Sequence, residues 1–111
     1  MVEYSFQLDN IFGSLADATR RDILRRVSQA ELSVTEIATS YDVTLAAVSK
    51  HLKILEQARL IIKRRQGKQQ LVQASPAALK DASDCLKYYE QLWINRLDRL
   101  EALLNKEQTD A

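Results

Sequence analysis

The sequence lacks the features of a secreted or membrane protein. Cys85 is its only cysteine, so one chain cannot form an internal disulfide. The amino terminus has no apolar run behind a basic start, as a signal peptide has. No segment approaches the ~18 apolar residues that a membrane span requires. We therefore expect a reduced protein of the cytoplasm that makes no membrane contact.

Glycine and proline are also scarce, with two glycines and one proline in 111 residues. Gly13 is placed to end a short first helix over residues 8–12. Gly67 is placed to supply a positive φ in a tight loop. Pro76, behind Ser75 as an N-cap, suits the first position of a helix. All three residues lie at the boundaries between expected helices and strands. The length of the chain suits one domain.

The charge is nearly balanced in total but unevenly distributed. Sixteen basic and 15 acidic residues leave a net charge of +1. Residues 44–74 carry seven basic side chains and one acidic, a net of +6, between flanks of −3 (residues 1–43) and −2 (residues 75–111). A positive middle between negative flanks is typical of a face that binds a polyanion. A solvated basic hairpin without a ligand is the alternative, and charge alone does not distinguish the two.

Capping residues predict three helix starts. Asp17 is a suitable N-cap, Ser33 forms a capping box with Glu36 three residues later, and Thr44 caps another helix. Apolar residues before two of the caps are placed to pack on the helix that follows: Leu32 on Ile37, and Val43 on Val48. Ser33 and Thr44 are eleven residues apart, which leaves room only for a tight turn. The pair therefore predicts a helix-turn-helix.

Apolar spacing indicates which faces of these helices point inward. The expected buried positions are Ile23, Leu24 and Val27 in the helix over 18–29, and Val48, Leu52 and Leu55 in the helix over 44–58. The expected outward positions are Arg20, Arg21, Arg25 and Arg26 in the first, and Ala46, Ser49, Lys50, Lys53 and Gln57 in the second. Short or basic side chains on the second helix would allow it to approach a groove closely, with Lys50 and Lys53 near phosphates.

Residues 60–74 predict a β-hairpin, with strands over 60–65 and 69–74 around a loop at 66–68. Three basic side chains, Arg64, Arg65 and Lys68, cluster near its tip. They are suited to phosphate contacts, although basic residues also protect edge strands from aggregation, and both roles can hold together.

The last helix is expected over residues 76–104, roughly 40 Å at ~1.5 Å per residue, with a polar flexible tail at 105–111. Apolar residues recur in it every three or four positions. A body this small cannot bury that whole stripe, so the surplus needs a partner helix. A symmetric homodimer is the commonest solution, and folding back onto its own domain is the alternative.

Three segments resemble the ArsR/SmtB family of winged-helix repressors, in the same order and spacing, over about residues 10–104. They are Leu15-Ala16-Asp17-Ala18-Thr19-Arg20-Arg21-Asp22-Ile23-Leu24, Glu31-Leu32-Ser33-Val34-Thr35-Glu36-Ile37-Ala38, and Val48-Ser49-Lys50-His51-Leu52-Lys53-Ile54-Leu55 continuing into Ala58-Arg59-Leu60-Ile61. The resemblance implies a mainly α winged helix-turn-helix domain with a small β-hairpin. It implies a homodimeric transcriptional repressor that binds double-stranded DNA.

The resemblance also implies which parts act. The helix over 44–58 becomes the recognition helix, the hairpin over 60–74 becomes the wing, and the first and last helices form the dimer interface. The residues expected at DNA are Thr44, Leu45, Ala47, Ser49, Lys50, His51, Lys53, Arg64, Arg65, Gln66 and Lys68. Those expected at the dimer interface are Phe6, Leu8, Leu86, Tyr89, Trp93, Leu97, Leu100 and Leu104.

The sensing residues of the metal-binding relatives do not carry over. Ser33 and Thr35 stand where the arsenic and cadmium type has cysteines, and hydroxyls are poor ligands for soft metals. The last helix has no histidine, and its Asp81 and Asp84 are better read as surface residues. Cys85 is read as a packing residue, with a pair between subunits as the alternative. We therefore expect no metal site and no cofactor, and an unidentified small-molecule effector remains open.

Two positions on the recognition helix have more than one interpretation. Leu45 stands where the family often has glutamine, so it can contact a thymine methyl but cannot hydrogen-bond to a base. His51 borders the packed face, which favours a partly buried, hydrogen-bonded histidine over a phosphate contact.

The sequence is also compatible with two other classes of function, to different degrees. A winged-helix module for protein contacts, without specific DNA binding, is the alternative function. An enzyme is least favoured, because the sequence offers no phosphate-binding glycine loop and no nucleophile–base pair.

Overall fold

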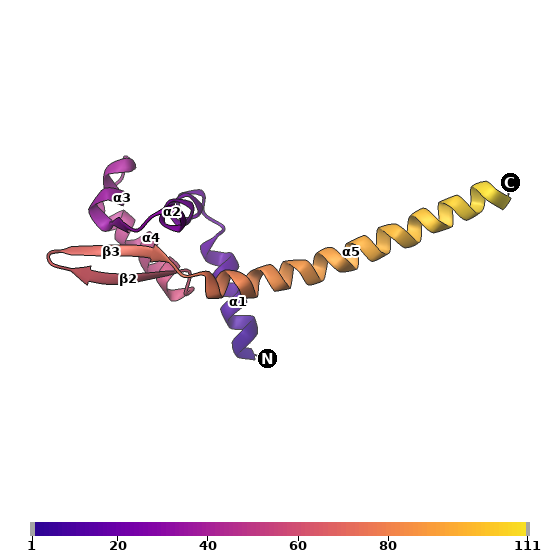
Figure 1. Cartoon of the computed structure of the whole chain (residues 1–111), viewed down its shortest axis with the longest axis horizontal. Coiled ribbons are helices and arrows are strands. Elements are labelled where there is room, and N and C mark those ends of the chain that lie inside the picture. The colour runs from indigo at the N-terminus through magenta and orange to yellow at the C-terminus, as the bar shows by residue number, and fades with distance from the viewer. Residues whose placement is uncertain (1, 111) are drawn as a thin grey trace.

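The structure, a computed structural model, describes the backbone of residues 2–110 and the side chains of residues 7–108. Its elements are α1 (Val2–Ser14), α2 (Ala18–Gln29), β1 (Leu32–Ser33), α3 (Val34–Ser40), α4 (Leu45–Gln57), β2 (Ile61–Gln66), β3 (Gln69–Ala74) and α5 (Pro76–Asp110). Figure 1 shows a small body from which α5 projects as a single rod, and the molecule measures 74 × 33 × 21 Å.

The core lies where α1, α2, α3, α4 and the inner ends of β2 and β3 meet. Its fully buried members include Ile11, Ile23, Ile37, Leu52 and Leu55. The inward positions predicted for α2 and α4 are confirmed, since all six side chains are at most 7% exposed. Only the first turns of α5 contribute, through Ala78 and Ala82 with Leu79 packed beside them. The body is therefore packed against the first turns of α5, while the exposed residues 86–108 of that helix take no part in the core.

The three predicted helix starts are present as capped termini. The side chains of Asp17, Ser33 and Thr44 each accept a hydrogen bond from the backbone N–H three residues on. Glu36 returns a bond to the Ser33 backbone, which completes the capping box. Such caps each contribute about 1 kcal/mol and fix where the helix begins. The register of α4, and hence its outward face, is set by this local chemistry.

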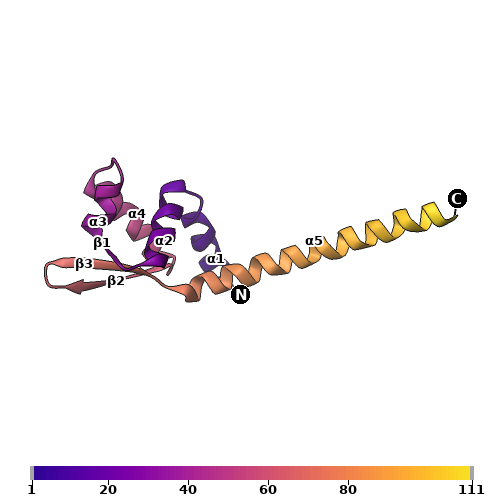
Figure 2. The same cartoon turned by 45° about the horizontal axis from the view of Figure 1, so that its top comes forward.

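The wing belongs to a three-stranded sheet in the order β1-β3-β2 (Figure 2). The hairpin is in register from Ile61 opposite Ala74 to Gln66 opposite Gln69, and Gly67 has the predicted positive φ of +62°. The short strand β1 was not predicted. It pairs Leu32 with Val72 and Ser33 with Leu71, so the wing is tied to the start of α3.

The turn before α4 is held by α2. Arg26 donates a hydrogen bond to Ser40 Oγ at 2.9 Å and lies over the Tyr41 ring at 5.4 Å. The Tyr41 hydroxyl donates to Asp22, and this bond keeps the pKa of the Asp22 carboxyl below its usual range. Arg20 and Arg26 are therefore half-buried rather than outward-facing, whereas Arg21 and Arg25 are exposed as expected.

Two expectations about the ends of elements were wrong. Gly13 lies inside α1, which starts at Val2 and ends at Ser14, so it does not end a short helix. Helix α5 continues to Asp110, so residues 105–110 are helical rather than a flexible tail. Val43, which we expected to pack on the fully buried Val48, is 44% exposed.

Candidate nucleic-acid interface

Helix α4 presents a polar outer face. Ala46, Ser49, Lys50, Lys53 and Gln57 are all exposed, while the opposite side of the helix packs into the core. Among the side chains that the structure describes, no acidic group pairs with Lys50 or Lys53. Thr44 is engaged as the cap, since its Oγ1 accepts from Ala47 N at 3.1 Å, and Ala47 is half-buried. The face thus offers two uncompensated positive charges.

His51 lies on the flank of α4 that faces α2. Its side chain is 24% exposed, and Arg20 Nη1 lies 3.4 Å from its Nδ1. Because arginine only donates, this hydrogen bond requires Nδ1 to accept and leaves the proton on Nε2. Arg20 is itself anchored on the last turn of α1, at 2.6 Å from the Ser14 carbonyl oxygen. The prediction of a partly buried, hydrogen-bonded histidine is confirmed.

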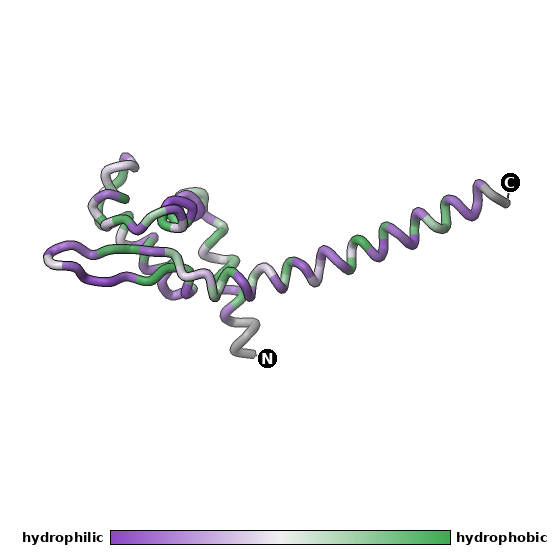
Figure 3. Tube along the Cα trace, viewed as in Figure 1, coloured by the Kyte–Doolittle hydropathy of each residue, from purple (hydrophilic) through white to green (hydrophobic). Residues whose placement is uncertain are grey.

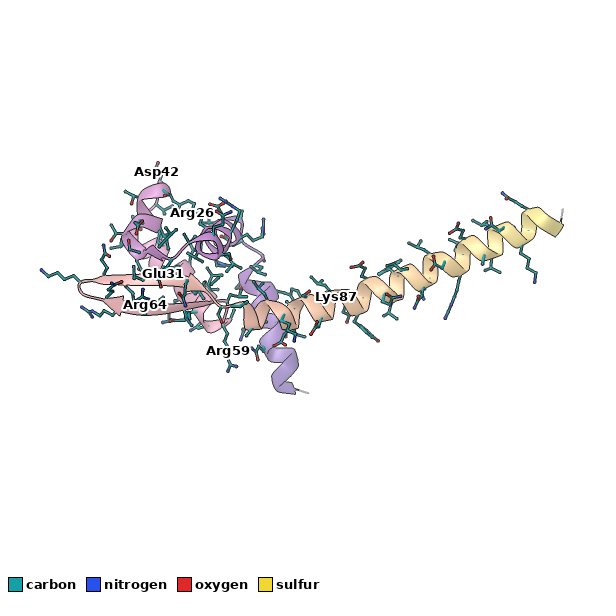
Figure 4. The ribbon with its side chains drawn as sticks, viewed as in Figure 1. Arg26, Glu31, Asp42, Arg59, Arg64 and Lys87 are labelled. Carbon is teal, nitrogen blue, oxygen red and sulfur yellow. The ribbon has the colours of Figure 1, made fainter. Side chains whose placement is uncertain are left out.

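The wing is less positive than its sequence indicates, because two of its basic residues are paired. Arg64 makes two hydrogen bonds to Glu31, at 2.8 and 2.6 Å, and lowers the pKa of that carboxyl. Glu31 directly precedes β1, and β3 lies between β1 and β2, so this pair spans β3; Figure 4 labels the two side chains next to each other. Lys63 lies 3.5 Å from Glu56 of α4.

The wing tip keeps its positive charge. Gln66 and Lys68 are exposed, and Arg65 Nε donates to the Gly67 carbonyl oxygen at 3.5 Å. A shallow depression beside them is lined by Arg65, Lys68, Gln69 and Gln70. Two of the seven basic residues of 44–74 are paired with carboxylates, which leaves five without such a partner among the described side chains: Lys50, Lys53, Arg59, Arg65 and Lys68.

Helix α5 carries most of the exposed large apolar side chains among the described residues. Tyr88 and Leu103 are each more than half exposed, and so are six further residues along it: Leu86, Tyr89, Trp93, Leu97, Leu100 and Leu104. These six repeat every eleven residues (86 and 97, 89 and 100, 93 and 104), which keeps them on one face of a nearly straight helix. Figure 3 shows apolar segments alternating with polar ones along the whole rod. Of the two interface residues expected in α1, Leu8 packs partly against its own core, and the Phe6 side chain lies outside the described residues.

Known proteins share this arrangement. A helix-turn-helix domain model matches residues 15–64. The transcriptional regulator Rv2034 of Mycobacterium tuberculosis is 34% identical over 102 residues, 92% of each chain. The crystal structure of an ArsR family transcriptional regulator superposes with a TM-score of 0.76 at 31% identity, over 80% of this chain and 92% of that one. This chain belongs to the ArsR family of transcriptional regulators. A homodimeric winged helix-turn-helix DNA-binding domain of Mycobacterium bovis shares the fold, with a TM-score of 0.66 at 23% identity over 81% of this chain and 84% of that one.

The family supports a winged helix-turn-helix regulator. The protein-contact module is not favoured, because relatives that cover nearly the whole chain are named as transcriptional regulators.

Of the two hydroxyl residues that we expected not to bind a metal, Ser33 has a structural role. Ser33 is 2% exposed, and its Oγ accepts from Glu36 N at 3.1 Å. Thr35, the second residue of α3, is exposed. Within the described part of the chain, no three His, Cys, Asp or Glu side chains lie close enough together to hold a metal ion. None of the described helices is both long and apolar enough to cross a membrane.

Sequence reasoning missed the pairing of Arg64 and the contact between Arg20 and His51. Arg64 and Glu31 are 33 positions apart, and Arg20 and His51 are 31 apart. No local pattern marks either pair. The strand order β1-β3-β2 would have been needed to find the first, and the packing of α2 on α4 to find the second.

Proposed function

We propose that this protein is a homodimeric repressor that binds double-stranded DNA in a sequence-specific manner, and that it acts in the cytoplasm. The observation that carries the proposal is the outer face of α4, where Lys50 and Lys53 are exposed without acidic partners. In this proposal α4 enters the major groove and the wing tip lies on the neighbouring backbone. Transcription is blocked by occupation of the operator.

The two kinds of contact divide between charged and short side chains. Lys50, Lys53, Arg65 and Lys68 bind phosphates and fix the position of the protein without reading bases. Arg64 contributes less, because the Glu31 carboxylate already compensates its charge. His51 donates from Nε2 to a phosphate while Arg20 holds its other ring nitrogen. Base contacts come from the first turns of α4, where Leu45 and Ser49 are exposed.

The dimer forms through α5 in this proposal. The apolar stripe from Leu86 to Leu104 packs on the same stripe of a second copy, in a two-fold arrangement. The Mycobacterium bovis domain with this fold is described as homodimeric. The α4 helices of the two copies would then lie on one face of the dimer and enter successive major grooves ~34 Å apart. The operator is then a sequence with two-fold symmetry.

Two adjacent wing arginines provide the test. The affinity for an operator selected from random sequence is measured against salt concentration for Arg65→Ala and Arg64→Ala. Each phosphate contact adds about 0.9 to the slope of log affinity against log salt. Arg65→Ala should therefore lower the slope by roughly 1 to 2 per dimer, and Arg64→Ala should lower it by less. Equal effects would refute the assigned contacts, and failure to enrich any two-fold symmetric sequence would refute the proposed function.

A further inference from the structure

Leu45 is exposed in a way that packing does not explain. It is the first residue of α4 and is 55% exposed, whereas Val48, Leu52 and Leu55 on the helix are at most 1% exposed and Ile54 is half-buried. A leucine in the first turn of a helix is not needed for the cap, which Thr44 provides. Its apolar surface is therefore available to a ligand.

The surroundings of Leu45 lack hydrogen-bonding groups of the kind that read purines. Ala46 and Ala47 follow it, and the Oγ1 of Thr44 already accepts from the backbone. Guanine and adenine are read in the major groove by bidentate Arg, Lys, Asn or Gln side chains. The nearest basic residue along α4 is Lys50, and the only amide on the helix is Gln57 at its far end. The first turn thus presents carbon surface where a polar side chain would otherwise be expected.

The major groove has one prominent apolar group, the 5-methyl of thymine. We propose that Leu45 determines specificity by packing on a thymine methyl in each half-site of the operator. This inference rests on the proposed function, because it requires α4 to lie in the major groove. It adds the class of base that is read and the chemistry by which it is read.

The size of the effect follows from the buried area. Covering one methyl group corresponds to an affinity gain of about 4-fold. A symmetric operator contains the contact twice, so loss of both methyls should weaken binding by about 15-fold. Such a change is easily resolved in a binding titration.

The experiment removes the methyl without altering base pairing. The full chain is used to select an operator from random sequence. Thymines are then replaced by deoxyuridine, one symmetric pair at a time, and the dissociation constants are measured by fluorescence anisotropy. When one particular symmetric pair of thymines is replaced, the affinity of the native protein for the operator should fall by about 15-fold. The Leu45→Ala variant should bind the unmodified thymine operator more weakly than the native protein does, by a similar factor. Its affinity should not change when deoxyuridine replaces thymine at that pair.

Val43→Ala is the matched control. Val43 is also apolar and 44% exposed, but it precedes the Thr44 cap and lies outside α4. This variant should keep the full sensitivity to deoxyuridine. Circular dichroism should be unchanged for both variants, because both side chains are exposed.

Two results would overturn the inference: a native protein that tolerates deoxyuridine at every position within 2-fold, or a Leu45→Ala variant that keeps the native sensitivity. The salt dependence separates this failure from that of the proposed function. If the affinity for the methyl-free operator still falls steeply with salt concentration, the proposal of DNA binding is retained and only the role of Leu45 is refuted. If no symmetric operator can be selected, both fall.

Discussion

At the scale of single residues, the Ser33–Glu36 pair shows how strongly one polar side chain can be committed to structure. Each partner satisfies a backbone N–H of the other residue, at 3.1 Å in both directions. Because the Ser33 backbone N–H donates to it, the Glu36 carboxylate is favoured in the folded protein and its pKa is lowered from 4.5. The stability that it confers therefore depends on pH.

Glu36→Gln tests this dependence. Glutamine keeps the geometry of the capping box but has no charge to lose. A lowered folded-state pKa gives stability that is present in full above the ordinary value of 4.5 and is lost as the pH falls through the lowered value. The free energy of unfolding of the native protein should therefore exceed that of the Glu36→Gln variant by the largest amount at neutral pH. The difference between the two proteins should shrink below about pH 4.

Urea unfolding at a fixed protein concentration, followed at several pH values, measures both curves. The fixed concentration keeps the contribution of dimer formation comparable between the two proteins. Parallel curves for the two proteins across the acid range would contradict the assigned role of the carboxylate.

At the scale of elements, the helix starts could be predicted from the sequence because each depends on residues three apart. Asp17, Ser33 and Thr44 carry this local signal, and so do the inward faces of α2 and α4. The faces of α4 that carry the candidate site were predictable for the same reason. What depends on distant contacts was not predictable.

The errors have physical causes of this kind. Residues 32 and 33 form a strand only because β3 lies beside them in space, nearly 40 positions later in the chain. Gly13 stays helical because the flanking residues Ile11 and Ser14 are buried and hold that turn in place, which outweighs the cost of about 1 kcal/mol for glycine in a helix. The polar residues after Leu104 include no helix breaker, so α5 continues to Asp110.

Leu97→Asp tests the role of α5 as a dimer interface. The variant places two carboxylates, one from each copy, in the expected apolar contact, and buried charges without partners are costly. We expect the dimer dissociation constant to rise by about a hundredfold or more. Sedimentation equilibrium gives the constant directly.

Asn95→Asp is the matched control for that variant. It adds the same charge two residues away, on the opposite side of α5, where Asn95 is exposed and accepts from Gln91. Its dimer should be as stable as that of the native protein. A Leu97→Asp variant with the native dissociation constant would rule out the stripe as the interface.

At the scale of the whole molecule, the shape itself indicates a missing partner. The radius of gyration is 20.2 Å, whereas a compact chain of this length has a value of about 13 Å. The excess comes from α5, whose distal part is exposed throughout residues 86–108. A single copy is thus a folded body with an uncovered arm.

Metal ions should not release this protein from its operator. The prediction follows from Ser33, which is buried as a helix cap, and from the lack of a histidine in α5. Stoichiometric zinc, cadmium or arsenite should leave the dissociation constant unchanged within 2-fold in an anisotropy titration. Release by one equivalent of any of the three would contradict it, and a chelator-treated sample serves as the control.

The uncovered arm also links the lifetime of the protein to its abundance. In a single copy, the distal turns of α5 are held by little beyond their own helical hydrogen bonds, and an unsupported helix opens readily. A protease that cleaves opened segments acts in proportion to how often they open. Dimer formation covers the distal part of α5 and reduces how often it opens, whereas dilution shifts the population toward single copies. We therefore expect a cell that makes little of this regulator to degrade it faster as well, which would sharpen the difference between low and high levels.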